Sequence, residues 1–273
     1  MQRLAYESAA FKDPELPVIF HLDTTWPGRP FNIHWQDSLE MLYMVEGEAE
    51  VSSDTLRQVI RTGEIAVINS GHIHEIRALT PVTRYYCLLA ERELCEQLGA
   101  PVGQVQFCLR VSDAMAREYF DRIVDEMLTR SAYYKPAVRA DLGGLLVHLC
   151  RHWVERKEFD GERKDKRLDM VKAAISYIQL HLSEELSVEQ ISAAAGFSKY
   201  YFCRGFKEIT GRTVVDYINY TRCCYARRLL LSGKCNVSES AELSGFSNLS
   251  YFAKTYKKYM GELPSKVERR EGP

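Results

Sequence analysis

Short runs of apolar residues alternate with turn residues over the first 110 positions of the chain. Six such runs lie between residues 39 and 90, and residues such as Gly47, Gly63 and Pro81 separate them. Runs of this length between glycine and proline are typical of β-strands. Strands at this density indicate a sandwich or a barrel. The pattern therefore predicts a β-domain over residues 1–110.

The pattern changes to a helical one after Val111. Ser112 and Asp113 offer a helix cap, and the apolar residues behind them recur at spacings of three and four. This predicts two helices over residues 111–154, which form either a dimer contact or only a cover for the barrel. The pattern is carried by Met115, Tyr119, Ile123 and Met127 in the first helix, and by Leu142, Leu145, Leu146 and Leu149 in the second.

A highly charged stretch, ERKEFDGERKDKR at residues 155–167, separates this region from the rest of the chain. Its charge and its glycine predict a solvated linker. Beyond it, residues 168–273 show helical spacing throughout. We therefore expect an α+β fold, in which a β-barrel and a helical dimerisation segment are followed by an all-α domain.

The net charge of −1 conceals two oppositely charged halves. Residues 1–162 hold 17 Lys and Arg against 25 Asp and Glu, a net charge of −8, whereas residues 163–273 hold 19 against 12, a net charge of +7. A basic half is suited to bind a polyanion. A solvated basic face is the ordinary alternative.

Composition excludes several classes of protein. Hydrophobic residues make up 46% of the 273 residues and charged residues 27%, which excludes extensive disorder and a mainly membrane-embedded chain. Glu7 stands where an export signal needs an apolar run, so we expect a cytoplasmic location and no membrane partner. The eight cysteines form no Cys-x-x-Cys pair, which argues against a zinc ribbon or a redox motif.

The strongest signal is an internal repeat in the basic half. GFSKYYFCRGFKEITG at residues 196–211 aligns with GFSNLSYFAKTYKKYMG at residues 245–261, which is one residue longer. A helix-capping motif, led by Ser187 or by Asn236, precedes each copy. A short helix, a tight turn with glycine and a second helix form the helix-turn-helix plan. The repeat therefore predicts two helix-turn-helix units.

The second helix of each unit has an inward apolar stripe and an outward polar face. Residues on the outward face of such a helix reach base edges in the major groove, where Arg or Lys pairs with guanine and Asn with adenine. We expect the two helices to enter adjacent grooves roughly 34 Å apart. The candidate DNA-binding residues are Lys199, Tyr200, Cys203, Arg204 and Lys207 in the first unit, and Asn248, Leu249, Ser250, Ala253 and Lys254 in the second.

Residues 168–268 resemble the DNA-binding domain of the AraC/XylS family of bacterial transcription regulators. GFS, Phe206-Lys207 and Gly211 match the family's first motif, and Arg222 opens its pattern in the linking helix, Val214–Leu231. The resemblance implies double-stranded promoter or operator DNA as a partner, a small-molecule effector and a homodimer. It also allows RNA polymerase as a partner and implies that the chain is not an enzyme.

The chain departs from the family pattern at three places. Ser240 stands where the family usually has an apolar residue, and this is expected to loosen its helix. Tyr256 replaces the usual phenylalanine, which matters little if its hydroxyl group finds a partner. Val267-Glu268 follows Pro264 in place of a Tyr-Arg pair, which removes one cation that would meet a phosphate.

The β-domain carries a second resemblance, to the two cupin motifs. A metal-bearing cupin binds its ion with three histidines and one glutamate, and here Gln36 stands in place of one histidine. His34, Glu40 and His74 remain as at most three good ligands. We therefore expect no metal and no other cofactor, with a divalent metal at these three residues as the alternative.

A ligand pocket without metal is the favoured interpretation, because barrel mouths hold small molecules between apolar walls and a few polar groups. The family's sugar-sensing members imply a sugar or another small polyol as the effector. The candidate effector-binding residues are Arg29, His34, Gln36, Glu40, His74, Trp35 and Tyr43.

The sequence thus favours a sequence-specific DNA-binding transcription regulator that a small-molecule effector controls. Two alternatives stay open. One is a metal-dependent cupin enzyme with a helical appendage. The other is an effector-independent activator whose barrel serves only for dimerisation.

Overall fold

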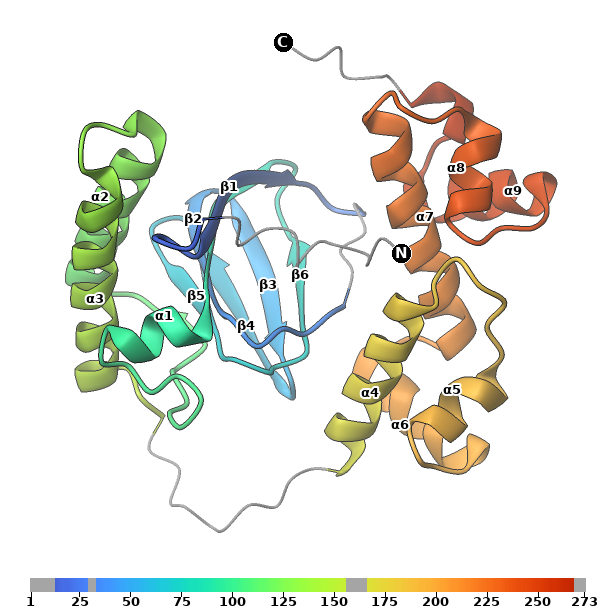
Figure 1. Cartoon of the computed structure of the whole chain (residues 1–273), viewed down its shortest axis with the longest axis horizontal. Helices are drawn as coiled ribbons and strands as arrows, with labels where there is room; N and C mark the ends of the chain where they lie inside the picture. The colour runs from blue at the N-terminus through green and yellow to red at the C-terminus, as the bar shows by residue number, and fades with distance from the viewer. Residues whose placement is uncertain (1–12, 29–32, 156–165, 268–273) are drawn as a thin grey trace. The chain divides into compact units, whose positions relative to one another are not determined.

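The computed structural model describes residues 13–28, 33–155 and 166–267. The chain divides into two compact units, residues 1–163 and 164–273 (Figure 1). Most of the predicted linker lies outside the described residues. Within the described ranges, no helix has the length and apolar character needed to cross a membrane. The α+β class predicted from the sequence is confirmed, since strands make up the first unit with a few helices and the second is helical.

Two antiparallel sheets form the centre of the first unit. The five-stranded sheet has the order β1-β7-β2-β5-β8, and the three-stranded sheet has the order β4-β3-β6 (Figure 1). The six predicted strands correspond to β2 to β7, whereas β1 and the short β8 were not predicted. The strands are β1 Val18–Thr25, β2 Leu39–Glu46, β3 Glu48–Ser53, β4 Leu56–Arg61, β5 Ile65–Ile68, β6 His74–Ala78, β7 Thr83–Ala90 and β8 Arg110–Val111.

Strand β2 is buried on both faces, which explains its continuous apolar sequence LEMLYMVE. Side chains alternate along a strand. Leu42 and Met44 join a core that both sheets enclose. Leu39 and Met41 join a second core, on the opposite face of the strand. Glu40 is two positions from Leu42 and therefore lies on the same face of β2, whereas Tyr43 lies on the opposite face.

Glycine is required at the turn between β2 and β3. Gly47 has a φ of +81°, and a Cβ atom there would lie 2.3 Å from both Thr80 Oγ1 and Val82 O. Such a separation is far below van der Waals contact. The residue therefore fixes the hairpin both by its backbone conformation and by the lack of a side chain.

The helices of the first unit are α1 Arg92–Gln97, α2 Ala114–Thr129 and α3 Tyr134–His152. The side chain of Asp113 caps α2 by accepting a hydrogen bond from Ala116 N at 2.8 Å. Buried residues of α2 and α3 share the core on the outer face of β2. The two helices therefore cover the barrel, while a role in dimerisation stays a prediction.

The predicted apolar stripe is correct for α3 and partly wrong for α2. Leu142, Leu145, Leu146 and Leu149 are all buried, as expected. In α2 the inward residues are Ala116, Phe120 and Ile123, whereas Met115 is 47% exposed. A spacing of four drifts around a helix of 3.6 residues per turn, so the stripe from Met115 does not stay on one face.

The second unit contains only helices among its described residues. The linking helix α7 has the bounds predicted for it, and the apolar side chains that it buries include Val214, Ile218 and Ala226. The elements are α4 Lys166–Leu180, α5 Val188–Ala194, α6 Lys199–Thr210, α7 Val214–Leu231, α8 Val237–Leu243, α9 Leu249–Met260 and the short 3₁₀ helix η1 Pro264–Lys266 (Figure 1).

Candidate DNA-binding face and effector site

The two predicted helix-turn-helix units are present. In the first, α5 leads into α6, and in the second, α8 leads into α9. Both capping boxes form, since the side chains of Ser187 and Asn236 each accept a hydrogen bond from the backbone three residues onward. Gly196 and Gly245 hold the turns with φ of +80° and +86°. The repeat in the sequence thus encodes two copies of one local structure.

Aromatic residues anchor α6 and α9 from the inside. Phe202 and Phe206 are fully buried in α6, and Phe252 and Tyr256 are fully buried in α9. The ring centroids of the two pairs lie 5.7 Å and 5.4 Å apart. The stripe predicted from the sequence fixes one face of each helix and leaves the opposite face to solvent.

The two buried departures from the family pattern leave polar atoms without partners. Ser240 Oγ and Tyr256 OH are buried and have no hydrogen-bond partner among the described residues. An unsatisfied buried hydroxyl costs about 1–3 kcal/mol. The aligned positions of the first unit hold Ile191 and Phe206, which carry no polar side-chain atoms.

The outward face of α6 carries the predicted residues of the first unit. Tyr200 is 81% exposed, Lys207 is exposed and Cys203 is half-buried. The two other cations of this face are paired with carboxylates: Lys199 with Glu189 of α5, and Arg204 Nε with Glu208 Oε1 at 2.8 Å. Their contact with DNA would replace these exposed ion pairs.

The outward face of α9 is more open. Leu249 is 49% exposed, Ser250 and Lys254 are exposed, and Ala253 is half-buried. Lys254 forms no ion pair with any other described residue. Asn248 caps α9, because its Oδ1 accepts a hydrogen bond from Tyr251 N at 2.8 Å. A bidentate contact of Asn248 with adenine therefore requires that oxygen to accept a second hydrogen bond.

Helix α7 ties the second helix-turn-helix unit to the first. Arg222 of α7 donates from Nε to Leu182 O at 3.0 Å and from Nη2 to Glu184 O at 2.6 Å. Gly245 lies against the same place, since a Cβ atom there would be 2.4 Å from Leu182 O. Asn219 of α7 donates from Nδ2 to Tyr251 OH of α9 at 3.0 Å. These contacts fix the relative orientation of the two units.

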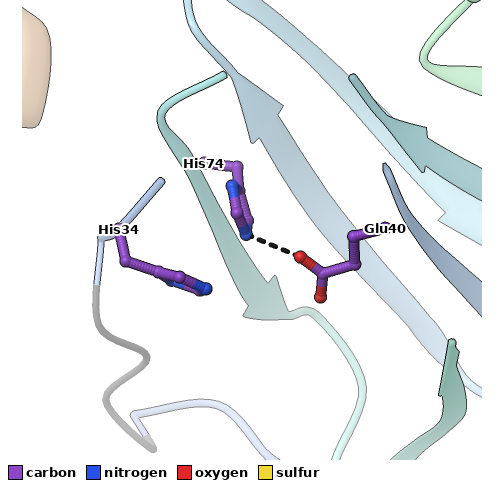
Figure 2. A group of neighbouring side chains, drawn as sticks. All are labelled: His34, Glu40 and His74. Atoms are coloured by element: carbon purple, nitrogen blue, oxygen red, sulfur yellow. Dashed lines mark ion pairs between the residues drawn. The ribbon is translucent and has the colours of Figure 1, made fainter. Parts of the chain in front are cut away.

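A cluster of polar side chains lies where β2 and β6 begin, in the two different sheets of the first domain. Figure 2 shows His34, Glu40 and His74 turned toward one another. His74 Nε2 lies 2.8 Å from Glu40 Oε2, and both side chains are almost fully buried. The His34 and His74 rings lie 4.2 Å apart, and the backbones of these two residues form a β-bridge. The structure therefore brings together the three residues that the sequence singled out as candidate ligands.

Glu40 receives two further hydrogen bonds in this cluster. Gln36 Nε2 donates to its Oε2 at 2.7 Å, and Cys87 Sγ donates to its Oε1 at 3.3 Å. Burial raises the pKa of Glu40, but the charge and hydrogen bond of His74, the charge of His34 and the Cys87 hydrogen bond outweigh it and hold the pKa at about 2. The carboxylate is thus ionised in the protein interior.

Among the remaining effector candidates, the structure separates Tyr43 from this cluster. Tyr43 points to the opposite face of β2 from Glu40, where its ring lies 5.1 Å from that of Phe120. Burial and a hydrogen bond with Asp121 raise the pKa of Tyr43 to about 12. An odd difference in position puts two strand residues on opposite faces, so Tyr43 does not line the same space as Glu40. Trp35 is half-buried next to His34, and Arg29 lies outside the described residues.

The roles of two residues, Cys87 and Arg222, were not predicted. Cys87 meets Glu40 because β2 and β7 pair with Leu42 opposite Cys87, a register that the sequence pattern did not fix. Arg222 appeared in the sequence only as part of a family motif. Its position more than two turns into the linking helix gave no signal that it reaches backbone carbonyls beyond α4.

Comparisons with known proteins agree with this architecture. Residues 16–149 match the AraC-like ligand binding domain, and residues 191–270 match a helix-turn-helix domain. The HTH-type transcriptional regulator YdeC of Bacillus subtilis (strain 168) is 23% identical over 252 residues, which cover 85% of this chain and 84% of YdeC. The HTH-type transcriptional regulator SACOL0084 of Staphylococcus aureus (strain COL) is 23% identical over 235 residues, which cover 84% of this chain but 31% of that protein.

The whole fold also has solved counterparts. An apo form of ToxT from Vibrio cholerae strain SCE256 has a TM-score of 0.55 at 14% identity, over 91% of this chain and 96% of ToxT. ToxT with a bound unsaturated fatty acid gives 0.52 at 14% identity, over 91% of this chain and 94% of ToxT. At this identity the likeness concerns the fold. With a ligand-binding domain over residues 16–149 and a helix-turn-helix domain over residues 191–270, the chain belongs to the AraC-type DNA-binding transcription regulators.

Proposed function

We propose that this regulator reads DNA with the outward faces of α6 and α9 and that a small molecule bound in the barrel controls this binding. The observation that carries the proposal is the repeated helix-turn-helix unit, with two anchored helices held on α7. Two such helices on one rigid support suit adjacent major grooves. Such a chain acts on promoter DNA, so we place it in the cytoplasm.

The outward residues have the chemistry that base reading requires. Arg204 and Lys254 supply donors for guanine, while Leu249 and Ala253 supply apolar contacts for a thymine methyl group. Lys199, Lys207 and Tyr200 lie on the same exposed side of α6 and suit phosphate oxygens. A net charge of +7 over residues 163–273 adds attraction that does not depend on base sequence.

The effector is proposed to bind next to the polar cluster of the barrel. His34, Gln36 and His74 provide hydrogen-bonding groups for hydroxyls, which fits the sugar or polyol predicted from the sequence. ToxT, in contrast, has been solved with a fatty acid. Without a cation in the site, a fatty acid carboxylate would face the ionised Glu40, and like charges in a buried site repel each other. The polar cluster therefore favours a polyol.

We propose that the regulator is a homodimer and that the outer faces of α2 and α3 form the contact. Met115, Leu128 and Val147 are exposed there by 47%, 62% and 39%. Their burial in a dimer would remove apolar surface from water. Sedimentation of the full chain and of a Leu128→Glu variant tests this, since the variant should be shifted to monomer. Activation of transcription through RNA polymerase belongs to the same proposal.

DNA binding of the full chain tests the central part of the proposal. Fluorescence anisotropy with DNA selected from a random pool should give an affinity that falls steeply as salt rises, because bound phosphates release counterions. The absence of salt-dependent binding to any selected DNA contradicts the proposal. A thermal-shift screen with sugars and fatty acids then tests the effector, since a ligand of the native state raises the apparent stability.

A further inference from the structure

The cluster in Figure 2 has the dimensions of a metal site. One ligand atom from each of His34, Glu40 and His74 lies within 4.8 Å of the others. Nitrogen and oxygen ligands lie about 2.1 Å from a transition-metal ion, so two ligands of one ion are at most about 4.2 Å apart. Shifts below about 1 Å would bring all three atoms onto one ion. The residues come from β2, from β6 and from the segment before β2.

The hydrogen bonds around the cluster orient these ligand atoms. His74 Nδ1 lies 3.0 Å from His72 O, and a carbonyl oxygen only accepts, so Nδ1 carries a hydrogen atom and Nε2 faces Glu40. Cys87 donates to Glu40 Oε1, which turns Oε2 toward His74. Partners of this kind fix the ligands of metal sites in many proteins. His74 Nε2 and the Glu40 carboxylate oxygen lie 2.8 Å apart, and without a cation between them each would present a lone pair to the other, so this place takes either a proton or a metal ion.

Gln36 adds an independent observation. Its side chain is 94% buried, as its exposed fraction is 6%, and its Oε1 has no hydrogen-bond partner among the described residues. Its Nε2 donates to Glu40 Oε2 at 2.7 Å, so the amide lies beside the carboxylate that faces His74. A buried amide oxygen without a partner, on a side chain that is hydrogen-bonded to the carboxylate of this cluster, is a group that a bound cation would satisfy.

We propose that His34, Glu40 and His74 bind one divalent transition-metal ion, with Gln36 beside it. The inference names a ligand of the proposed effector site, and its regulatory meaning rests on that proposed function. Two imidazoles and one carboxylate suit Fe²⁺, Co²⁺, Ni²⁺ or Zn²⁺, whereas Mg²⁺ and Ca²⁺ prefer oxygen ligands throughout. Three protein ligands leave a coordination position for an oxygen atom of the effector. The presence of Gln36 in place of the third histidine therefore does not abolish the site.

Metal binding to the full chain tests the proposal directly. The chain is stripped with a chelator, mixed with Co²⁺ or Zn²⁺ alone, passed through a desalting column and analysed for metal. We expect about one ion per chain, with a visible Co²⁺ spectrum typical of nitrogen and oxygen ligands. Glu40→Gln and His34→Ala should each weaken binding by at least about tenfold. His181→Ala serves as the control. His181 pairs with Glu184 in the helical part of the chain, residues 164–273, so this variant should leave metal binding unchanged.

A gain-of-affinity variant keeps the test independent of folding defects. Gln36→His offers a third imidazole to the same ion and should tighten binding by at least about tenfold. The proposal is overturned if the wild-type chain retains no ion and Gln36→His retains none either. Equal affinity in the wild type and in Glu40→Gln also overturns it. DNA binding by the same samples separates the two proposals, since a chain that binds DNA but no metal contradicts only the metal site.

Discussion

The two helix-turn-helix units share one plan but differ in what stabilises them. The first unit closes its core with Ile191 and Phe206, whereas the second has Ser240 and Tyr256 at the aligned positions, with two buried hydroxyls that lack partners among the described residues. The second unit is instead held by polar contacts with α7, such as the hydrogen bond that Asn219 Nδ2 of α7 donates to Tyr251 OH of α9. A repeated sequence motif therefore specifies the same local fold without specifying the same source of stability.

The surfaces of the two units differ as well. Lys199 and Arg204 on α6 are engaged with Glu189 and Glu208, while Lys254 on α9 has no ion-pair partner among the described residues. Exposed ion pairs contribute about 0–1 kcal/mol, so the first unit loses a small amount when its cations turn to DNA. The second unit loses nothing of this kind. The difference predicts unequal contributions of the two units to DNA binding.

The largest expected effect is at the turn glycines. Gly245→Ala should destabilise α8 and α9 by roughly 3 kcal/mol, because a left-handed residue with a side chain costs about 1–2 kcal/mol and the clash with Leu182 O adds about 1–3 kcal/mol. Gly196→Ala should cost only about 1–2 kcal/mol, since open space surrounds that position. Hydrogen exchange read by mass spectrometry measures both locally. Equal effects would contradict the assigned role of Gly245.

The next effect concerns DNA affinity. Lys254→Ala should weaken binding by about 1–3 kcal/mol and relax the preference at one base pair. Arg204→Ala should lie in the lower part of that range, because the wild-type arginine must give up Glu208. Anisotropy titrations with selected DNA at two salt concentrations measure both. An unchanged affinity in both variants would refute the assignment of the outward faces.

The two helix-turn-helix units differ at one aligned core position, with Phe206 in the first and Tyr256 in the second. Replacing each residue by the other type should change stability in opposite directions. Tyr256→Phe should stabilise the second unit by about 1 kcal/mol, since it removes a buried hydroxyl without a partner. Phe206→Tyr should destabilise the first unit by about 1–3 kcal/mol for the converse reason. Hydrogen exchange in α9 and α6 reports each change. If Tyr256→Phe instead lowers protection, the hydroxyl has a stabilising partner and the comparison fails.

The smallest effect is pH-dependent and concerns the link between α7 and α9. Asp216 Oδ1 accepts from Tyr259 OH at 2.6 Å and from Lys258 Nζ at 3.0 Å. Burial raises the pKa of Asp216, but these hydrogen bonds outweigh it and lower the pKa. A lowered carboxyl pKa stabilises the fold above the unfolded value of about 3.9, and this contribution is lost progressively as pH falls from there through the lower pKa of the folded state. Asp216→Asn should therefore cost less than about 1 kcal/mol at pH 7, and its cost should shrink as pH falls below about 3.9.

Much of this architecture was predictable because its signals are local. Capping residues, turn glycines and apolar stripes act within one or two helical turns, so the repeat predicted both helix-turn-helix units and the bounds of α7. The short apolar runs between turn residues likewise predicted β2 to β7. The face of Tyr43 was predictable in principle, since strand alternation separates it from Glu40.

The rest depends on contacts between distant segments. Cys87 reaches Glu40 through the register of β2 and β7, and Arg222 reaches Leu182 O across 40 positions in sequence. The cap that Asn248 forms on α9 was not predicted, whereas its contact with a base stays a prediction. His34, Glu40 and His74 were named from a motif, whereas their convergence and the orphaned oxygen of Gln36 emerged only from the packing of the barrel.

A hydroxyl-radical footprint of the full chain on selected DNA tests most directly whether both units read DNA. Two helices fixed on α7 should protect two segments whose centres lie about one helical turn, roughly 10 base pairs, apart. Lys254→Ala should weaken protection mainly in one segment and Arg204→Ala in the other. A single protected segment in the wild type, or one that both variants affect equally, would contradict the account.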